Sequence, residues 1–328
     1  MRSPLNKRLF RELRGEFGKY LVIFILMTLT IGMVSGFLVA DGSMIQAYEE
    51  SFEKYNIENG HFRTEKKMNN VQIQDIEDLG IKLYENYYVE EALTNGSTMR
   101  IFKNRDEVNK VCLMKGKMPE KPGEIGIDRM YADNNDLSVG DEIESGGHTW
   151  KITGLVALSD YSALFSNNND SMFDSVKFGV SVVCPEEFDS YKADQLNYSY
   201  AWKYNTEPKN EKAEKDISED LMEDVAKEVT LEEFVPRYTN QAIIFTGDDM
   251  GGDRSMMIVL LYIIIVIMAF VFAITTSNTI RKEANVIGTL RASGYTRGEL
   301  IRHYMTAPVF VTFIGAIIGN IIGYTVGK

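Results

Sequence analysis

The residue types that most often perform catalysis are sparse in this chain and lie far apart along it. The histidines are His61, His148 and His303, and their separation does not match the spacing of metal ligands. The sequence has no G-x-x-x-x-G-K-[ST] loop for a nucleotide phosphate, no H-E-x-x-H or C-x-x-C motif and no nucleophile elbow. We therefore expect no catalytic site, no metal and no cofactor, and an energy source outside the chain.

The two cysteines are the remaining candidates for covalent chemistry. Cys112 and Cys184 both lie in β-rich runs, KVCLM and SVVCP. An oxidising compartment would permit a disulfide between them, although buried free thiols are common in protein cores. The sequence favours free thiols and leaves a bridge open.

Three long stretches contain no Asp, Glu, Lys or Arg: residues 20–40, 255–276 and 304–327. Each has at least the roughly 20 residues that a helix needs to cross the apolar core of a bilayer. The mean hydropathy of -0.17 is consistent with this pattern, because a long polar stretch separates the first two runs. We predict a membrane protein with three transmembrane helices.

The basic residues indicate how these helices are oriented. Residues 1–19 and 277–303 both have an excess of Lys and Arg, and such segments mark the cytoplasmic side. Residues 41–254 are then extracytoplasmic, and the chain lies in the cell membrane with its N-terminus in the cytoplasm. The acidic character of residues 41–254 argues against nucleic-acid binding, and a solvated acidic surface explains it more simply than a dedicated cation or basic-ligand site.

The N-terminal segment, residues 1–19, has Leu5, Leu9, Leu13 and Phe17 at every fourth position with basic residues between them. This pattern predicts an amphipathic helix on the inner leaflet. A cleaved signal peptide is the alternative. The length of the following apolar run favours a retained signal anchor.

The exported region, residues 41–254, is predicted to be a large α+β domain. It begins with a helical continuation of the first span and then alternates β-rich runs, such as residues 82–93, with helical pieces and turns. Residues 247–253, GDDMGGD, are expected to break the structure before the second span, either as a hinge or as a simple connector.

Glycines recur at every fourth position inside the first and third spans. Small residues at this spacing allow close helix packing in membranes, although glycine is generally enriched there. We predict helix packing at Gly32, Gly36, Gly315, Gly319 and Gly323.

Residues 115–156 resemble the core of the exported domain in the FtsX-like permease family, the membrane subunits of MacB-type ABC transporters. In that family a G-x-x-P…G-E-I turn is followed by a helix, a V-G-D triplet and a strand that ends in glycine. The matching residues here are Gly116, Pro119, Gly123, Glu124, Ile125, Val139, Gly140, Asp141 and Gly154.

Residues 277–303 are similar to the cytoplasmic loop between the second and third spans of the same family. The sequence has Val286 where the family usually has a glutamate, with Glu283 one turn earlier, and Tyr295 where a small residue is usual. The predicted ATPase-coupling residues are Arg281, Glu283, Ile287, Gly288, Leu290, Arg291, Gly294 and Arg297.

The residue types suggest how such a loop would work. Ile287, Leu290 and Arg291 can share one face of a short helix that docks into a groove on a cytoplasmic ATPase. Gly294 is expected to end that helix, and Thr296 to cap the next one. A charged loop that only fixes the topology is the simpler alternative.

The resemblance implies a permease that couples ATP hydrolysis by a separate ABC ATPase, which binds the ATP and magnesium, to movements of a MacB-like exported domain. Expected partners are the ATPase, a second permease copy or paralogue, the bilayer and an extracytoplasmic protein; the substrate would be a peptide, lipid or antimicrobial. The family unit has four spans, so a fragment of a longer permease is expected, and a fourth helix supplied by another chain is the alternative. The alternatives are an FtsX-like regulator of an exported cell-wall hydrolase and a membrane-anchored sensor or adhesin without an ATPase.

Overall fold

The computed structural model describes residues 14–145 and 147–328. The predicted amphipathic helix falls mostly on residues 1–13, which lie outside the described residues. The chain forms two compact units: one contains the described residues up to Ala47 together with Asp249–Lys328, and the other is Tyr48–Asp248. We call the first the membrane unit and the second the α+β domain.

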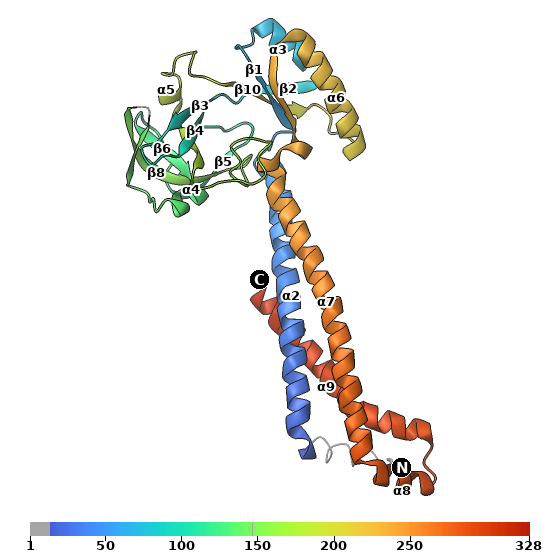
Figure 1. Cartoon of the computed structure of the whole chain (residues 1–328). Coiled ribbons are helices and arrows are strands. Elements are labelled where there is room, and N and C mark those ends of the chain that lie inside the picture. Colours follow the sequence, from blue (N-terminus) through green and yellow to red (C-terminus); the bar gives the residue numbers. More distant parts are fainter. Residues whose placement is uncertain (1–13, 146) are drawn as a thin grey trace. The chain divides into compact units, whose positions relative to one another are not determined.

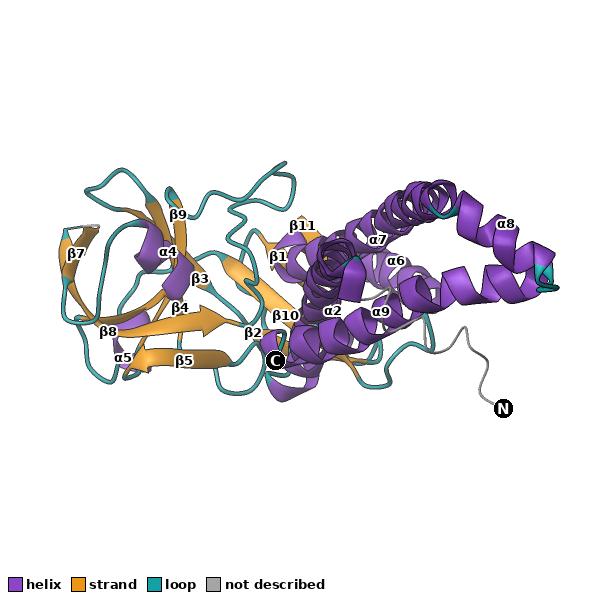
Figure 2. Cartoon of the chain, turned by 90° about the horizontal axis from the view of Figure 1, so that it is seen from below, coloured by secondary structure: helices purple, strands orange, loops and turns teal. Residues whose placement is uncertain are grey.

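The described part of the membrane unit consists of helices and the short turns that join them, whereas the strands, orange in Figure 2, belong to the α+β domain. Its helices are labelled in Figure 1. Among the described residues, three helices are long and apolar enough to cross a membrane, as predicted: α2 (Phe17–Lys54), α7 (Gln241–Lys282) and α9 (Arg297–Val326). The short helix α8 (Ala284–Ala292) lies between α7 and α9.

Helix α7 runs without interruption through residues 247–253, so the predicted break there is wrong. Its first turn is capped by Asn240, whose side chain accepts a hydrogen bond from the backbone N–H of Ala242 at 3.1 Å. A Cβ at Gly247 would lie 2.6 Å from the ring of Tyr48. The glycine at position 247 therefore permits close packing of Tyr48, whose hydroxyl donates to the carbonyl of Ile243 at 3.0 Å.

The α+β domain contains two sheets. The first is antiparallel and has the order β11 (Leu231–Pro236), β1 (Gly60–Thr64), β10 (Tyr198–Tyr204), β2 (Ile81–Glu85). The second is mixed and has the order β3 (Tyr88–Ala92), β4 (Thr98–Lys103), β9 (Phe178–Val183), β6 (Glu124–Asp128), β8 (His148–Leu158), β5 (Val111–Gly116), with β7 (Glu142–Ser145) paired to β8. The remaining elements are α3 (Asn70–Glu77), α4 (Arg129–Asn134), α5 (Pro185–Phe188), α6 (Glu211–Glu228) and the 3₁₀ turn η1 (Arg237–Thr239). The predicted α+β fold between the first and second spans is thus confirmed.

The β-rich run at residues 82–93 does not form one strand. It divides at Asn86 into β2 and β3, which belong to different sheets. Asn86 is buried, its backbone N–H donates to Ser199 at 2.9 Å, and its side-chain oxygen accepts from Arg105 at 2.7 Å. A buried polar residue satisfied by distant partners therefore marks the point where the chain changes sheets.

One hydrophobic core extends through both sheets. In the first sheet it is aromatic, with Trp202 stacked on Phe234 at 4.8 Å between ring centroids and Phe62 beside Tyr200 at 5.6 Å. In the second sheet every residue of β9 is buried, as expected for a strand covered on both faces. The cysteines form no disulfide: Cys184 is buried in this domain, and the hydroxyl of Tyr55 lies 3.2 Å from Cys112 Sγ.

Asp128 caps α4 and is itself buried. Its carboxylate accepts from the backbone N–H groups of Met130 at 2.8 Å and Tyr131 at 3.2 Å. Burial nevertheless raises its pKa to about 6, because the two hydrogen bonds only partly offset the loss of water. At neutral pH this residue is therefore a charged cap in a site that favours its neutral form.

We expect Asp128→Asn to stabilise the α+β domain at pH 7.5 by roughly 2 kcal/mol, because the amide keeps an acceptor oxygen and removes the buried charge. A carboxyl group whose pKa is higher in the folded than in the unfolded state destabilises the native state above the folded-state pKa. This loss of stability disappears as the pH falls toward the pKa of the unfolded state. The advantage of the variant should therefore shrink between pH 7.5 and pH 5. Urea unfolding followed by fluorescence of Trp150 and Trp202, both fully buried, measures it.

The matched control for this change is Asp133→Asn. Asp133 lies on the same helix, where it forms an exposed ion pair with Arg129 at 3.3 Å, and its loss is expected to change stability by less than about 1 kcal/mol. An advantage of Asp128→Asn that is the same at both pH values would contradict the assigned pKa.

Candidate functional site

The segment at residues 277–303, predicted to couple to an ATPase, folds as the end of α7, the whole of α8 and the start of α9. Helix α8 ends at its C-cap Ser293, followed by Gly294, which has φ +95°. The backbone N–H of Tyr295 then reaches back to Leu290 at 3.2 Å. Gly294 ends the helix as predicted, because glycine adopts this left-handed conformation without a steric penalty.

Thr296 caps α9, again as predicted. Its hydroxyl accepts from the backbone N–H of Glu299 at 3.3 Å, and the Glu299 carboxylate accepts from the backbone N–H of Thr296 at 2.8 Å. This reciprocal pair is a capping box. The turn between α8 and α9 is therefore defined by hydrogen bonds at both ends.

Helix α8 has no buried residue within the part of the chain that the structure describes. Ile287 and Leu290 are half-buried, and Gly288 and Arg291 are exposed. Arg281 and Arg297, at the two ends of the segment, are exposed as well. Four of the predicted coupling residues thus lie on α8, and the other four lie at its ends or in the adjoining helices.

Side-chain contacts between α7, α9 and α2 surround the start of α8. Glu283, its N-cap residue, accepts a hydrogen bond from the hydroxyl of Tyr304 on α9 at 2.5 Å. On α2, the ammonium of Lys19 reaches Thr279 of α7 at 2.5 Å and Glu16 at 2.8 Å. The sequence pattern predicted Glu283 but not Tyr304 or Thr279. Tyr304 begins an apolar run and Thr279 is an uncharged residue of the basic segment, so no local motif marks either of them.

The five glycines predicted to pack are brought together where α2 meets α9. A Cβ on Gly319 would lie 2.8 Å from the carbonyl oxygen of Thr28, and one on Gly323 would lie 2.6 Å from that of Gly32. Gly36 lies against Gly323 in the same way, with its own Cβ position 3.2 Å from the Gly323 carbonyl. Gly315 faces Met27 and Thr28 one turn further along. We call this contact the glycine seam.

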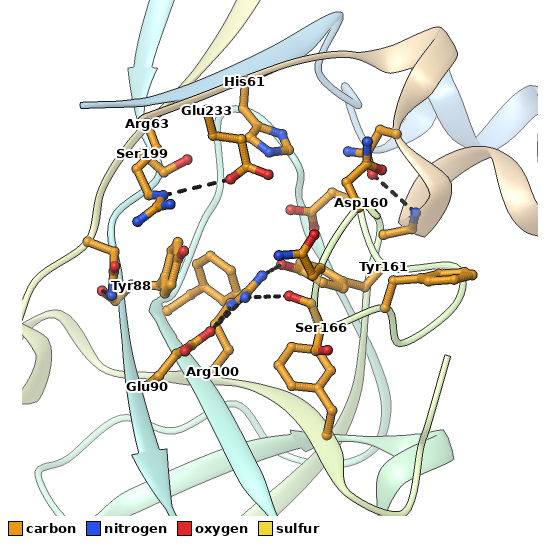
Figure 3. Close-up of a pocket in the computed structure, with 18 of the residues that line it drawn as sticks. His61, Arg63, Tyr88, Glu90, Arg100, Asp160, Tyr161, Ser166, Ser199 and Glu233 are labelled. Atoms are coloured by element: carbon orange, nitrogen blue, oxygen red, sulfur yellow. Dashed lines mark hydrogen bonds and ion pairs between the residues drawn. The ribbon is translucent and has the colours of Figure 1, made fainter. Parts of the chain in front are cut away.

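A cavity of about 610 Å³ lies within the α+β domain and was not predicted from the sequence. Figure 3 shows its labelled side chains around an open space. They come from β1, β10 and β11 of the first sheet, from β3 and β4 of the second, and from residues 160–168. The positions span residues 61–242, so no local motif could have revealed the site.

Arg100 lies on one side of this cavity, where its guanidinium is held from several directions. It donates to the Glu90 carboxylate at 2.6 Å, to the Tyr161 hydroxyl at 2.6 Å and to the Ser166 carbonyl at 2.8 Å. It also lies over the ring of Tyr88, 4.5 Å from the ring centroid. Arg100 therefore ties β4 to the loop at residues 160–170, which we call the 160–170 loop.

The 160–170 loop holds the first turn of α7. Within the α+β domain, the Ser162 hydroxyl donates to the carbonyls of Ala242 at 2.9 Å and Ile243 at 3.0 Å. The side-chain amide of Gln241 donates to the carbonyl of Asn168 at 2.6 Å. Residues 166–170 are thus part of a contact between the cavity and the start of α7.

Asp160, at the start of this loop, forms a buried ion pair. Its two carboxylate oxygens accept from the two terminal nitrogens of Arg105 at 2.7 and 2.8 Å. The side chains are 5% and 7% exposed. Such paired geometry compensates much of the cost of removing two charges from water.

His61 and Glu58 form a second ion pair at the other side of the cavity, 2.6 Å apart. Burial disfavours the charged form of each, but their mutual attraction outweighs it, so the pKa of Glu58 is lowered and that of His61 is raised. Glu58 also accepts from the amide of Asn109 at 2.6 Å. This network fixes the chain just after α2 ends at Lys54.

Comparison with known proteins bears on the membrane unit and on the α+β domain separately. Residues 258–328 match the family model described as FtsX-like permease C-terminal, whereas no curated protein matches the chain. Similar solved structures include the periplasmic region of MacB from Actinobacillus actinomycetemcomitans, at 11% identity and a TM-score of 0.30, covering 52% of this chain and 86% of that one. Another is the extracellular domain of the noncanonic ABC-type transporter YknZ from Gram-positive bacteria, at 8% identity and a TM-score of 0.28, covering 51% of this chain and 93% of that one.

The family match begins inside α7 and includes all of α8 and α9. It therefore contains the whole segment at residues 277–303 and the α9 side of the glycine seam. Together with the three apolar helices, it confirms the family predicted from the sequence. Over residues 258–328, this membrane protein thus matches the C-terminal part of the FtsX-like permeases.

Proposed function

We propose that this chain is the transmembrane subunit of a MacB-type ABC transporter and that α8 receives the movement of a cytoplasmic ATPase. The observation that supports this most directly is the form of residues 277–303: a short helix, α8, with an unburied surface, bounded by the left-handed turn at Gly294 and joined to α9 through Glu283 and Tyr304. A helix that transmits force must be exposed to its partner and firmly attached to the helices that it moves.

The orientation follows from charge. The excess of Lys and Arg in residues 277–303 supports a cytoplasmic position for α8, with the α+β domain on the opposite side of the membrane. The sequence contains no nucleotide-binding loop, so ATP and magnesium would be bound by the partner ATPase. A second copy or a paralogous permease would complete the membrane assembly.

Continuous helices provide the route from the membrane to the α+β domain. Helices α2 and α7 both extend from the membrane unit into that domain without a break. In the domain, the 160–170 loop binds the first turn of α7, and Asn109 and Lys110 bind the chain where α2 ends, with Lys110 N–H donating to Tyr55 at 2.9 Å. Movement of either helix would therefore be passed to the sheets, and the substrate, a peptide, lipid or antimicrobial, would be handled on that side.

Co-purification of the full-length chain with the ABC ATPase encoded beside its gene tests this function. We expect the wild-type chain to retain the ATPase and the double variant Leu290→Ala, Arg291→Glu to lose at least tenfold in affinity, because an apolar anchor and an arginine at an interface centre are each worth about 1–2 kcal/mol or more. Affinity is measured by titrating the ATPase onto the permease in lipid nanodiscs.

The matched control is Met222→Ala, Lys227→Glu, which makes the same kind of change on the exposed side of α6. It should leave ATPase binding unchanged. Full binding by the α8 double variant would refute docking through this helix. Absence of any ATPase partner would instead favour a membrane-anchored sensor.

A further inference from the structure

The cavity in the α+β domain has the size and position of a ligand site. Its volume of about 610 Å³ falls within the range of about 300–1,000 Å³ that is typical of small-molecule pockets. Both sheets line it, with His61 and Glu233 on the first and Tyr88 and Arg100 on the second. In Figure 3 these side chains face a common space from opposite sides. A molecule bound there would touch both sheets.

The charges around this cavity are balanced by one another. Arg100 is paired with Glu90 at 2.6 Å, and Arg63 lies 2.7 Å from Glu232 and 3.7 Å from Glu233. His61 and Asp160 belong to the pairs His61–Glu58 and Asp160–Arg105 described above, and the exposed residues Asp174 and Lys177 complete the charged lining. Although the exported region as a whole is acidic, acidic and basic side chains line the cavity together, and Arg100 and Asp160 are each held in an ion pair.

Polar groups able to bind a ligand remain at the cavity wall. Within the described part of the chain, the hydroxyls of Thr98 and Ser199 form no hydrogen bond, and the Glu233 carboxylate has only its long contact to Arg63. Carboxylate oxygens accept only, whereas hydroxyls both donate and accept. The wall therefore presents donors and acceptors together.

Aromatic rings form the rest of the lining. Tyr88 and Tyr161 are half-buried, and the rings of Phe102 and Phe178 pack behind them. The guanidinium of Arg100 covers one face of Tyr88 and lies 5.0 Å from the ring centroid of Phe178. Flat apolar surfaces thus alternate with the polar groups around the cavity.

We propose that this cavity binds a neutral, hydroxyl-rich molecule of one or two rings, a saccharide. Each hydroxyl of a sugar both donates and accepts, which suits a wall of paired charges and mixed donors and acceptors, and its C–H faces suit the tyrosine rings. A charged ligand would have to break an ion pair to bind Arg100 or Asp160. A saccharide satisfies the wall without doing so.

Such a ligand would also contact the machinery that holds α7. Tyr161 and Ser166 belong to the 160–170 loop, and both are bonded to Arg100 at the cavity. The same loop binds Ala242 and Ile243 in the first turn of α7. Occupancy of the cavity would therefore stiffen the connection between the second sheet and α7. Binding itself does not depend on the proposed ATPase.

The test is saturation-transfer NMR and calorimetry on the full chain in lipid nanodiscs with four probes: maltose, cellobiose, N,N′-diacetylchitobiose and, as a zwitterionic comparison, trialanine. We expect at least one disaccharide to bind saturably with a Kd of about 1 mM or tighter, near the lower limit of specific recognition. Thr98→Trp, which fills the cavity, should weaken that binding at least tenfold. Glu233→Gln should weaken it several-fold.

The control variant is Glu186→Gln, an exposed carboxylate on α5 outside the cavity, which should bind like the wild type. Urea unfolding of each variant verifies that it is folded. If Thr98→Trp is unfolded, the effect of Glu233→Gln on disaccharide binding decides whether the ligand occupies the cavity. Failure of every disaccharide to bind overturns the proposal, and so does binding that neither cavity variant weakens. Binding of trialanine alone, lost in the same variants, would also overturn it and assign the site to zwitterionic peptides. Each of these results is independent of ATPase docking.

Discussion

Arg105→Met is expected to destabilise the α+β domain by about 3–5 kcal/mol, the usual cost of leaving one member of a buried ion pair without its partner. Both oxygens of Asp160 would lose their charged donors, at 2.7 and 2.8 Å, while the carboxylate stays 5% exposed. Asn86 would lose its bond from Arg105 as well. The chain contains two tryptophans, Trp150 and Trp202, both buried in this domain, so tryptophan fluorescence during urea unfolding reports this loss specifically.

The control for this prediction is Lys103→Met on the neighbouring strand β4. Lys103 pairs with Asp189 at 3.0 Å, but the two side chains are 44% and 63% exposed, so its loss should cost less than about 1 kcal/mol. Adding Asp160→Asn to Arg105→Met should restore much of the lost stability, because the buried charge is then removed. Equal effects of Lys103→Met and Arg105→Met would show that burial of the pair has no energetic consequence.

Gly323→Ala is expected to separate α2 from α9. The added Cβ would lie 2.6 Å from the carbonyl oxygen of Gly32 and 2.8 Å from the backbone nitrogen of Gly36. Neither backbone atom can move away without shifting its helix, so overpacking should cost about 1–3 kcal/mol. In a bilayer, close packing rather than the hydrophobic effect drives helix association. The overpacking therefore weakens the association of α2 with α9 directly.

Disulfide cross-linking measures the contact between these helices. In a background with Cys112 and Cys184 replaced by serine, the pair Thr28→Cys and Gly315→Cys should oxidise readily, since the Gly315 Cβ position lies 3.4 Å from Thr28 Oγ1. Adding Gly323→Ala should slow cross-linking several-fold. Gly298→Ala, on the same helix but with no atom within 4 Å of its Cβ position, should leave the rate unchanged. Fast cross-linking in the Gly323→Ala variant would show that the glycine seam does not hold α2 and α9 together.

The structural findings also explain which contacts link the two proposals. Arg105–Asp160 and Arg100–Tyr161 both anchor the 160–170 loop, which binds α7. Loss of Arg105 should therefore affect saccharide binding and the attachment of α7 together. The Gly323→Ala substitution, in contrast, should affect only helix packing in the membrane unit.

Several features followed from the sequence because they depend on short-range rules. Span length needs only a run of uncharged residues that matches the bilayer. The end of α8 at Gly294 and the start of α9 at Thr296 depend on backbone conformation and a capping side chain within a few residues. The spacing of the glycines was likewise visible, although not which helix Gly323 would face.

Other features depended on partners that are distant in the sequence. Residues 247–253 have the composition of a break, yet they stay helical, with Asn240 capping the first turn and Tyr48 packing on Gly247. The run at residues 82–93 reads as one strand, but Asn86 is bonded to Arg105 and Ser199, and the chain changes sheets there.

By itself the sequence determined the number of spans, the α+β class of the intervening domain, the helix caps around α8 and the permease family, because periodicity, composition and local motifs encode these. Only the tertiary structure decided the cavity, the 160–170 loop that joins it to α7, and the pairing of the glycine seam. Each of these requires residues far apart in the chain to meet, and that proximity arises from packing of the whole core rather than from any local preference.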